Sequence, residues 1–272
     1  MNFSVLMSVY KNDRPIYFDR AIESISFSQT LEPDELVLIC DGEITEELGA
    51  VIEKWKAALQ DRLVLIRLEY NRGLAFALNE GLKHCTNDIV ARMDADDIAL
   101  SNRFESQVPY MNLNPDVAVL SSWVEEIDPE TEKVLGVRKV PPCDYSIRRM
   151  AERRNPINHP VSIFRKSAVL DLGGYPNFRK SQDYALWSLM LNNGCKMANL
   201  QKVLLKMRAG DALMSRRGME YFKHELKLLS FQRKIGFISW YNFIVNCSIR
   251  AFFRLAPSSL QLVMYRVLRL IK

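Results

Sequence analysis

The chain has 272 residues, of which 48% are hydrophobic and 25% are charged, and its formal net charge is +5. This composition is typical of a globular protein with a large buried core, and it excludes a disordered or fibrous chain. No run of 18 or more apolar residues occurs, so the sequence predicts no transmembrane helix, and the first ten residues, MNFSVLMSVY, predict a strand and not a signal peptide.

Charge and cysteine placement restrict the partners further. From Leu226 onward the chain has eight Lys or Arg and no Asp or Glu, so residues 1–225 carry a net charge of about −3. An acidic body without a nucleic-acid-binding motif argues against a nucleic-acid partner. The five cysteines are scattered and show no CxxC spacing, which predicts reduced cytoplasmic thiols and neither a disulfide framework nor a zinc site.

Strand-like and helix-like segments alternate over the first 120 residues. Near-continuous apolar runs predict strands at residues 3–9, 35–41, 62–69 and 88–94. Apolar residues at helical spacing predict the helices between them, at 15–29, 46–59 and from Gly73 onward. Apolar strands joined by amphipathic helices imply an α/β fold, with a mostly parallel sheet that is flanked by helices on both faces.

The second half of the chain has a less regular pattern. Helices are predicted near 100–112 and 182–193, and strands at 116–122, 159–166 and 202–208. Between 123 and 145, three prolines indicate turns or edge strands. The pattern of residues 219–272 predicts a basic, amphipathic helical tail that is unusually rich in aromatic residues.

An acidic cluster follows the fourth predicted strand. Asp94 and Asp96 are two residues apart, so on an extended segment they point to the same side, at the strand end where open α/β sheets bind ligands. Carboxylates are hard oxygen ligands that suit Mg²⁺ or Mn²⁺, and substrate phosphates complete the coordination shell of such an ion. The competing interpretation is structural, because Asp97 precedes a helical stretch and would cap it or lie in a solvated turn.

Four segments carry a family resemblance, namely MSVY (7–10), ICDG (39–42), NRGLAFALNEGL (71–82) and DADD (94–97). Over roughly residues 1–210, the chain resembles the family 2 glycosyltransferases, which have the Rossmann-like GT-A fold. One departure is that ICDG stands where many members have a DDGS segment. The resemblance implies a GT-A domain at 1–218, with a nucleotide-sugar half at about 1–115 and an acceptor half at about 116–218, followed by a C-terminal segment at 219–272.

The resemblance also implies a donor site. Members of the family bind a nucleotide sugar through positions that correspond here to Ser8, Tyr10, Asp41, Arg72, Asp94, Ala95, Asp96 and Arg216. By the same resemblance, Asp96 and Asp94 would bind the metal ion, and Asp41 would accept a hydrogen bond from the uracil N3–H. The structural alternatives are a simple turn at the Asp41-Gly42 pair and solvated loop positions for the two arginines.

The acceptor side depends on one carboxylate. An inverting transfer needs a general base for the acceptor hydroxyl. The family has this base in a Glu-Asp pair at a helix start, and GGYPNFRKSQD (173–183) matches that context with Gln182 in place of the glutamate. The resemblance therefore implies Asp183 as the base, and His159, Gln182 and Asp97 near the acceptor. The alternative is that Asp183 only favours a helix N-terminus through the dipole, and that His159 is structural.

The C-terminal segment predicts where the protein acts. Basic and aromatic residues that alternate on helices suit an anionic membrane surface, whereas the alternative is that these helices pack on the core. The chain is similar to short bacterial family members that assemble O-antigen or exopolysaccharide repeat units on undecaprenyl diphosphate. We therefore expect a cytoplasmic protein, peripheral at the inner face of the cell membrane, that uses Mn²⁺ or Mg²⁺.

The expected reaction is an inverting transfer of glucose or galactose from a UDP-sugar to a GlcNAc or GalNAc on lipid diphosphate, in a β-linkage, with β1,3 as the expected position. A noncatalytic membrane-associated scaffold would keep the same fold, but the intact set of Asp94, Asp96 and Asp183 argues against it. A sugar nucleotidyltransferase shares the α/β layout and the metal, but the chain lacks the glycine-rich basic loop expected near the N-terminus of that class.

Overall fold

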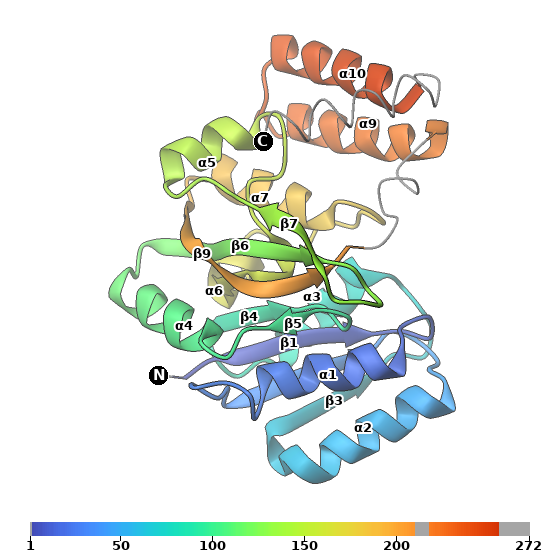
Figure 1. Cartoon of the computed structure of the whole chain (residues 1–272). Coiled ribbons are helices and arrows are strands. Elements are labelled where there is room, and N and C mark those ends of the chain that lie inside the picture. The colour runs from blue at the N-terminus through green and yellow to red at the C-terminus, as the bar shows by residue number, and fades with distance from the viewer. Residues whose placement is uncertain (1, 210–217, 256–272) are drawn as a thin grey trace. The chain divides into compact units, whose positions relative to one another are not determined.

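The computed structural model describes residues 2–209 and 218–255, and Figure 1 shows the course of the chain. The chain divides into two compact units, Met1–Ala209 and Gly210–Lys272. The first unit contains the sheet and every residue that the sequence predicts to be functional, except Arg216. Arg216 lies outside the described residues, so its expected contact with the donor stays a prediction.

The first unit begins with a parallel sheet. Its strands are β1 (Ser4–Val9), β2 (Glu35–Cys40), β3 (Leu63–Arg67) and β4 (Ile89–Met93). They lie in the order β3-β2-β1-β4, and each neighbouring pair is parallel, as the apolar runs of the sequence predict. Because all four strands run the same way, their carboxyl ends meet at one edge of the sheet, which is where ligands bind in open α/β sheets.

Helices cover both faces of this parallel sheet, as Figure 1 shows. They are α1 (Pro15–Ile25), α2 (Glu46–Leu59) and α3 (Leu74–His84). The α2 helix is capped by Thr45, whose side chain accepts a hydrogen bond from the first turn. On the other face, Gly81 of α3 lies so close to Leu6 and Ile39 that a larger residue would overlap them. The close approach of α3 to the sheet therefore depends on this glycine.

The sheet is mixed in its second half, where a mostly parallel sheet was expected. The further strands are β5 (Ile98–Ala99), β6 (Val117–Ile127), β7 (Val134–Arg138), β8 (Ile163–Arg165) and β9 (Lys196–Arg208). Strand β8 is antiparallel to both β4 and β6, β5 is antiparallel to β9, and β7 is antiparallel to β6, whereas β6 and β9 are parallel. The short turn between β6 and β7 enforces an antiparallel pair, because parallel neighbours need a long crossover.

The prolines between 123 and 145 fall where the sequence indicates turns and an edge strand. Pro129 lies in the β6–β7 turn, in which Asp128 Oδ1 accepts the backbone N–H groups of Glu130 and Thr131 at 3.1 and 2.8 Å. Strand β7 pairs only with β6 among the described residues, so it is an edge of the sheet. The chain then enters α5 (Asp144–Ala151), a helix that the sequence analysis did not predict.

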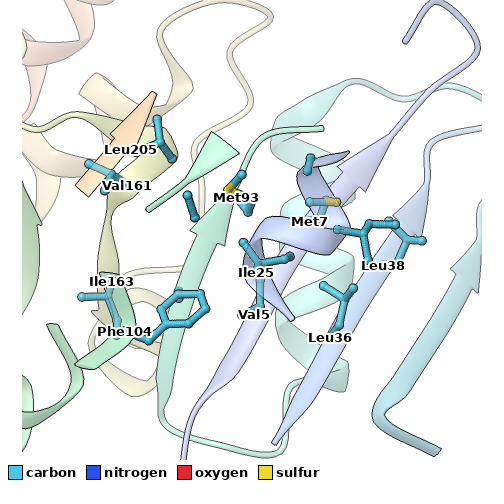
Figure 2. Packing of buried hydrophobic residues seen from close by; sticks show 14 of the residues in the cluster. Val5, Met7, Ile25, Leu36, Leu38, Met93, Phe104, Val161, Ile163 and Leu205 are labelled. Atoms are coloured by element: carbon cyan, nitrogen blue, oxygen red, sulfur yellow. The ribbon is translucent and has the colours of Figure 1, made fainter. Parts of the chain in front are cut away.

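One hydrophobic core extends through both halves of the first unit. Figure 2 shows Val5 and Leu38 of the parallel strands close to Ile25, and Phe104 and Ile163 beside them. All five side chains are fully buried, and each contributes about 1.5–3 kcal/mol to stability. The remaining helices are η1 (Gln60–Arg62), α4 (Arg103–Leu113), η2 (His159–Val161), α6 (Lys166–Leu170) and α7 (Gln182–Asn192). The shared core holds the two halves of the sheet edge in a fixed arrangement.

The second unit contains a pair of helices, α9 (Gly218–Lys234) and α10 (Trp240–Leu255). Glu225 of α9 forms ion pairs with Arg250 and Arg254 of α10, at 3.7 and 2.9 Å, and all three side chains are at least four-fifths buried. Exposed apolar side chains lie along α10, namely Trp240, Tyr241, Ile244, Ile249 and Phe252. Within residues 2–209 and 218–255, no helix has the length and apolar character needed to cross a membrane.

Candidate active site

The carboxyl ends of β1, β2 and β4 bring three predicted polar positions to the same edge of the sheet. Tyr10 follows β1, Asp41 follows β2, and Asp94 follows β4. Ser8 is the half-buried fifth residue of β1, and Ala95, beside Asp94, is buried. Apart from Arg72, which lies in the loop before α3, the donor residues that the sequence predicts from the first 97 positions therefore lie at or just after strand ends on one edge of the sheet.

Asp41 fixes the loop that carries Arg72. Its two carboxylate oxygens accept the backbone N–H groups of Arg72 and Gly73 at 2.8 and 2.9 Å, and the side chain is buried. Gly42 has φ of +87°, and a Cβ there would lie 2.5 Å from the backbone nitrogen of Asn71. A carboxylate oxygen has a second lone pair, so Asp41 keeps capacity for a uracil N–H while it holds this turn.

Arg72 is presented at the surface by this loop. Its guanidinium lies 3.5 Å from the ring centroid of Phe76, one turn into α3, and the side chain is exposed. Stacking on an aromatic ring limits the conformations of a long side chain while its charge stays in water. The loop thus offers a pre-oriented cation beside Asp41, and its contact with the donor stays a prediction.

Four carboxylates crowd the edge of the sheet near β4, and one of them, Asp13, was not predicted. Asp13 Oδ2 accepts the backbone N–H of Tyr10 at 2.9 Å. Burial, together with the charges of Asp96 and Asp94, raises the pKa of Asp13 to about 7. Burial, together with the charge of Asp94, raises the pKa of Asp96 to about 6. The cluster is therefore short of positive charge.

Asp97 has a structural role that differs from a helix cap. Its side chain is buried, and its Oδ1 accepts the backbone N–H of Arg208 at 2.9 Å, at the end of β9. The helix cap is wrong, because Asp97 is followed by β5 and α4 begins only at Arg103. Burial, together with the charges of Asp96 and Asp94, raises the pKa of Asp97 well above its usual value. A direct contact between Asp97 and the acceptor stays a prediction.

Two buried arginines lie beneath the acidic cluster. Arg92, whose side chain is 1% exposed, forms an ion pair with Asp94. Arg103 is fully buried and donates to the backbone oxygen of Arg92 at 2.6 Å. Burial and the charge of Arg92 lower the pKa of Arg103 to about 9. Arg92 lies on β4 and Arg103 at the start of α4, both within apolar patterns. Hydrophobic periodicity identifies such segments as buried elements but does not indicate that a charged residue within them is functional.

The donor set at this edge fits a divalent metal ion. The carboxylate oxygens of Asp94 and Asp96 are hard ligands. A bound cation would offset the repulsion between these carboxylates and the cost of burying their charge, which are the causes that raise the pKa values of Asp13 and Asp96. Among the described residues, no three His, Cys, Asp or Glu side chains converge as a complete metal site. An ion bound by Asp94 and Asp96 would need further oxygen ligands, which the phosphates of a substrate can supply.

Helix α7 supplies a further carboxylate. Asp183 is the second residue of α7, directly after Gln182, which is buried. Asn155 donates from Nδ2 to Asp183 Oδ2 at 2.6 Å. The sequence did not predict a role for Asn155, because this residue lies in an irregular segment before a proline. No periodic pattern there indicates which side chains are functional.

His159 is buried below this region, next to Tyr175. Its Nε2 lies 3.0 Å from the Tyr175 hydroxyl. Burial, together with the charge of Arg92, lowers the pKa of His159 to about 4, so the ring is neutral near pH 7. The charges of Asp183 and Asp94 both act on His159 and on Tyr175. The charge of the predicted base and that of one predicted metal ligand, Asp94, therefore reach the same buried pair.

Asn79 joins α3 to the glycine turn that precedes α7. Its side-chain amide accepts from the backbone N–H of Tyr175 at 2.7 Å and donates to the backbone oxygen of Tyr175 at 2.9 Å. Gly174 has φ of +81°, and a Cβ there would overlap the Asn79 side chain. The glycine turn that precedes Asp183 is thereby attached to α3, which begins at the Arg72 loop.

Comparison with known proteins places these features in a family. The family model described as Glycosyl transferase family 2 matches residues 4–173. A relative from Escherichia coli, UDP-Gal:alpha-D-GlcNAc-diphosphoundecaprenol beta-1,3-galactosyltransferase, is 40% identical over 265 residues, which are 97% of this chain and 95% of that protein.

Two solved structures share the fold. S. aureus TarS 1-349 in complex with UDP-GlcNAc has a TM-score of 0.69 at 18% identity, over 93% of this chain and 73% of that one. Mannosyltransferase PcManGT from Pyrobaculum calidifontis, in complex with GDP-Man and Mn²⁺, has a TM-score of 0.60 at 17% identity, over 99% of this chain and 80% of that one.

Proposed function

The chain belongs to glycosyl transferase family 2, has the GT-A fold and is a glycosyltransferase, and from this premise we propose that it transfers galactose from UDP-galactose to a GlcNAc linked to lipid diphosphate. The observation that carries the proposal is that Asp94, which follows β4, and Asp183, which begins α7, both exert their charge on the buried, hydrogen-bonded His159–Tyr175 pair. The choice of galactose over glucose, of GlcNAc over GalNAc, and of a β1,3 linkage follows the printed activity of the 40% identical relative.

The donor binds along the strand ends. Asp41 and the stacked Arg72 face the uridine, with Ser8 of β1 and Tyr10, which follows β1, beside it. Asp96 and Asp94 would hold Mn²⁺ or Mg²⁺, which would stabilise the charge that develops on the departing diphosphate. Arg92 keeps the Asp94 carboxylate in place through their ion pair.

The acceptor side performs the proton transfer. The acceptor hydroxyl oxygen forms a bond to the anomeric carbon of the donor, the bond from that carbon to the diphosphate oxygen breaks, and UDP leaves with the electron pair. Asp183 takes the hydroxyl proton, which makes the oxygen a better nucleophile. Attack on the face opposite the leaving group inverts the anomeric configuration, so an α-linked donor gives a β-linkage.

The second unit supports action at a membrane surface. The exposed side chains of α10 include Trp240, Tyr241 and Phe252, which suit the interface between headgroups and acyl chains. From Leu226 onward the chain carries only basic charges among its Asp, Glu, Lys and Arg residues, which suits anionic lipids. The proposed location is therefore the inner face of the cell membrane, peripherally bound, where a lipid-linked acceptor is available for repeat-unit assembly.

A UDP-release assay tests the proposal. UDP-galactose, UDP-glucose and UDP-GlcNAc are each supplied with Mn²⁺ or with EDTA, and with a synthetic GlcNAc- or GalNAc-diphosphate-lipid. We expect acceptor-dependent UDP release from UDP-galactose that EDTA, Asp96→Asn and Asp183→Asn abolish. The control, Asp61→Asn, changes an exposed aspartate on η1 and should leave the rate unchanged.

The same assay separates the alternatives. Release of diphosphate, and not of UDP, would identify a sugar nucleotidyltransferase. The absence of turnover with every donor and acceptor, together with unchanged membrane association of Asp96→Asn, would favour a noncatalytic scaffold.

A further inference from the structure

The side chain of Asn155 is fixed at both ends. Its Oδ1 accepts the backbone N–H of Ile157 at 3.2 Å, and its Nδ2 donates to Asp183 Oδ2 at 2.6 Å. The first bond determines the orientation of the amide. If the amide were reversed, its NH₂ group would face the backbone N–H of Ile157 and its oxygen would face the carboxylate of Asp183, and both contacts would be repulsive. The donor group of Asn155 is therefore directed at Asp183.

The segment that carries Asn155 is itself held in place. The backbone oxygen of Pro156 accepts from Asn199 Nδ2 of β9 at 3.2 Å, and Ile157 is 2% exposed. On the other side, Tyr184, the neighbour of Asp183, donates its hydroxyl to the backbone oxygen of Ala151 at 2.6 Å. Both partners of the Asn155–Asp183 bond thus belong to backbone that packing and hydrogen bonds immobilise.

We propose that Asn155 is a positioning residue for the general base, holding Oδ2 of Asp183 so that Oδ1 receives the proton of the acceptor hydroxyl. This inference rests on the proposed function, in which Asp183 is the base. A carboxylate with one oxygen engaged cannot rotate freely, and a small misplacement of a reacting group is costly in rate. A hydrogen bond to a carboxylate also favours its ionised form, which is the form that accepts a proton.

The surroundings of Asp183 determine how this role is measured. The charge of Asp183 acts on His159 of η2 and on Tyr175 of the glycine turn, and the charges of Arg92 and Asp94 act on the same pair. Burial lowers the pKa of His159 to about 4 and raises the pKa of Tyr175, so neither ring changes charge between about pH 5 and pH 9. In the chain, the basic residues Arg154 and Lys180 come one residue before Asn155 and three residues before Asp183.

Two substitutions test the inference through the pH dependence of kcat/KM, at saturating Mn²⁺ with the lipid-linked acceptor varied. Asn155→Ala removes the donor, so we expect kcat to fall roughly 10- to 100-fold near neutral pH while the KM for UDP-galactose is unchanged. The acidic limb of the profile should move to higher pH by about one unit, so that activity partly recovers in alkali. Asn155→Asp puts a second carboxylate beside the first and should move the limb further in the same direction.

Controls keep the outcomes distinct. Asn193→Ala removes an exposed asparagine at the other end of α7, whose Nδ2 donates to the Leu189 backbone oxygen, and should leave rate and profile unchanged. A loss that is equal at every pH and accompanies a lowered melting temperature would make Asn155 merely structural and overturn the inference. Wild-type kcat and an unmoved limb in Asn155→Ala would overturn it as well. Full activity of Asp183→Asn would instead show that the proposed base is wrong, and the inference would fall with it.

Discussion

At the scale of single residues, the acidic edge of the sheet depends on buried positive charge. Four carboxylates, Asp13, Asp94, Asp96 and Asp97, influence one another there, and burial opposes their ionisation. Arg92 forms an ion pair with one of them from below, although its own side chain is almost entirely removed from water. A buried charge that loses its partner is costly, so this arginine ought to matter for stability as well as for function.

The first prediction concerns Arg92. Arg92→Met removes the partner of Asp94 and should lower the free energy of unfolding by about 3 kcal/mol in metal-free buffer at neutral pH. Urea unfolding followed by circular dichroism measures the loss. Arg62→Met is the matched control, because Arg62 pairs with Glu32 at the surface at 2.5 Å, and exposed pairs contribute about 1 kcal/mol at most. Equal losses for the two variants would contradict the prediction.

The second prediction concerns the pH dependence that His159 gives to the fold. The pKa of His159 is about 4 in the folded chain and about 6.5 when unfolded, so between these values only the unfolded chain binds the proton. Its contribution to the free energy of unfolding therefore falls as the pH decreases, by about 2 kcal/mol between pH 7.5 and pH 5. His159→Gln has no group that titrates here. When the pH is lowered from 7.5 to 5, the free energy of unfolding of the variant should therefore rise by about 2 kcal/mol relative to that of the wild type.

Urea unfolding at the two pH values tests this shift, and the exposed His84→Gln serves as its control. An unchanged stability difference between wild type and His159→Gln at pH 7.5 and pH 5 would contradict the neutral, buried state of the ring.

At the scale of elements, the glycine turn before α7 is the point where the acceptor half is attached to α3. The turn needs Gly174 for two reasons, its positive φ and the absence of space beside Asn79. Gly174→Ala should therefore lower stability by about 2 kcal/mol or more, because both backbone strain and steric overlap are added. Thermal unfolding measures the change, and Gly49→Ala on α2, where a Cβ meets nothing within 4 Å, should be neutral or stabilising.

The elements that sequence reasoning found share one property, a long periodic pattern. The parallel strands and the helices between them follow from apolar runs and helical spacing, and α2 occupies the predicted residues 46–59. Strands β6, β8 and β9 overlap the strands predicted at 116–122, 159–166 and 202–208, whereas β5 and β7 have only two and five residues, which is too short for a pattern. The antiparallel pairing of this half of the sheet depends on partners that are distant in the chain, so it was not predictable from local sequence.

The candidate site divides in the same way. Asp94, Asp96 and Asp183 stand in motifs, so the sequence points to them directly. Arg92 and Asn155 act on those carboxylates from a buried strand and from an irregular loop. The role of Arg92 depends on Asp94, 2 positions away, and that of Asn155 depends on Asp183, 28 positions away. Composition and motif spacing do not reveal either contact.

At the scale of the whole molecule, charge separates the two units. From residue 210 onward there are 11 Lys or Arg against three Asp or Glu, whereas the first 209 residues have 26 against 29. The exposed aromatic side chains of α10 belong to the basic unit. Binding to anionic lipid surfaces is attractive for such a unit and unfavourable for the other, so the second unit is where we expect membrane contact.

The last prediction follows from this separation. Full-length protein should sediment with vesicles that contain anionic lipid, less with neutral vesicles, and less again as salt rises. Replacing Trp240 and Tyr241, which are 61% and 75% exposed, by serine should weaken binding several-fold. Tyr70→Ser, at 67% exposure in the first unit, is the matched control and should bind as wild type does. Equal binding of all three proteins would place membrane contact elsewhere.

The attachment of the acceptor half to α3 also limits how such enzymes can be recombined. Donor and acceptor halves share one sheet and one core, and Asn79 fastens them by two short hydrogen bonds. A hybrid protein that takes its second half from a relative must therefore keep a glycine turn with space for the Asn79 side chain. It must also keep the antiparallel pairing of β4 with β8. New linkages in such a lineage should arise more readily by substitution around the shared site than by exchange of whole halves.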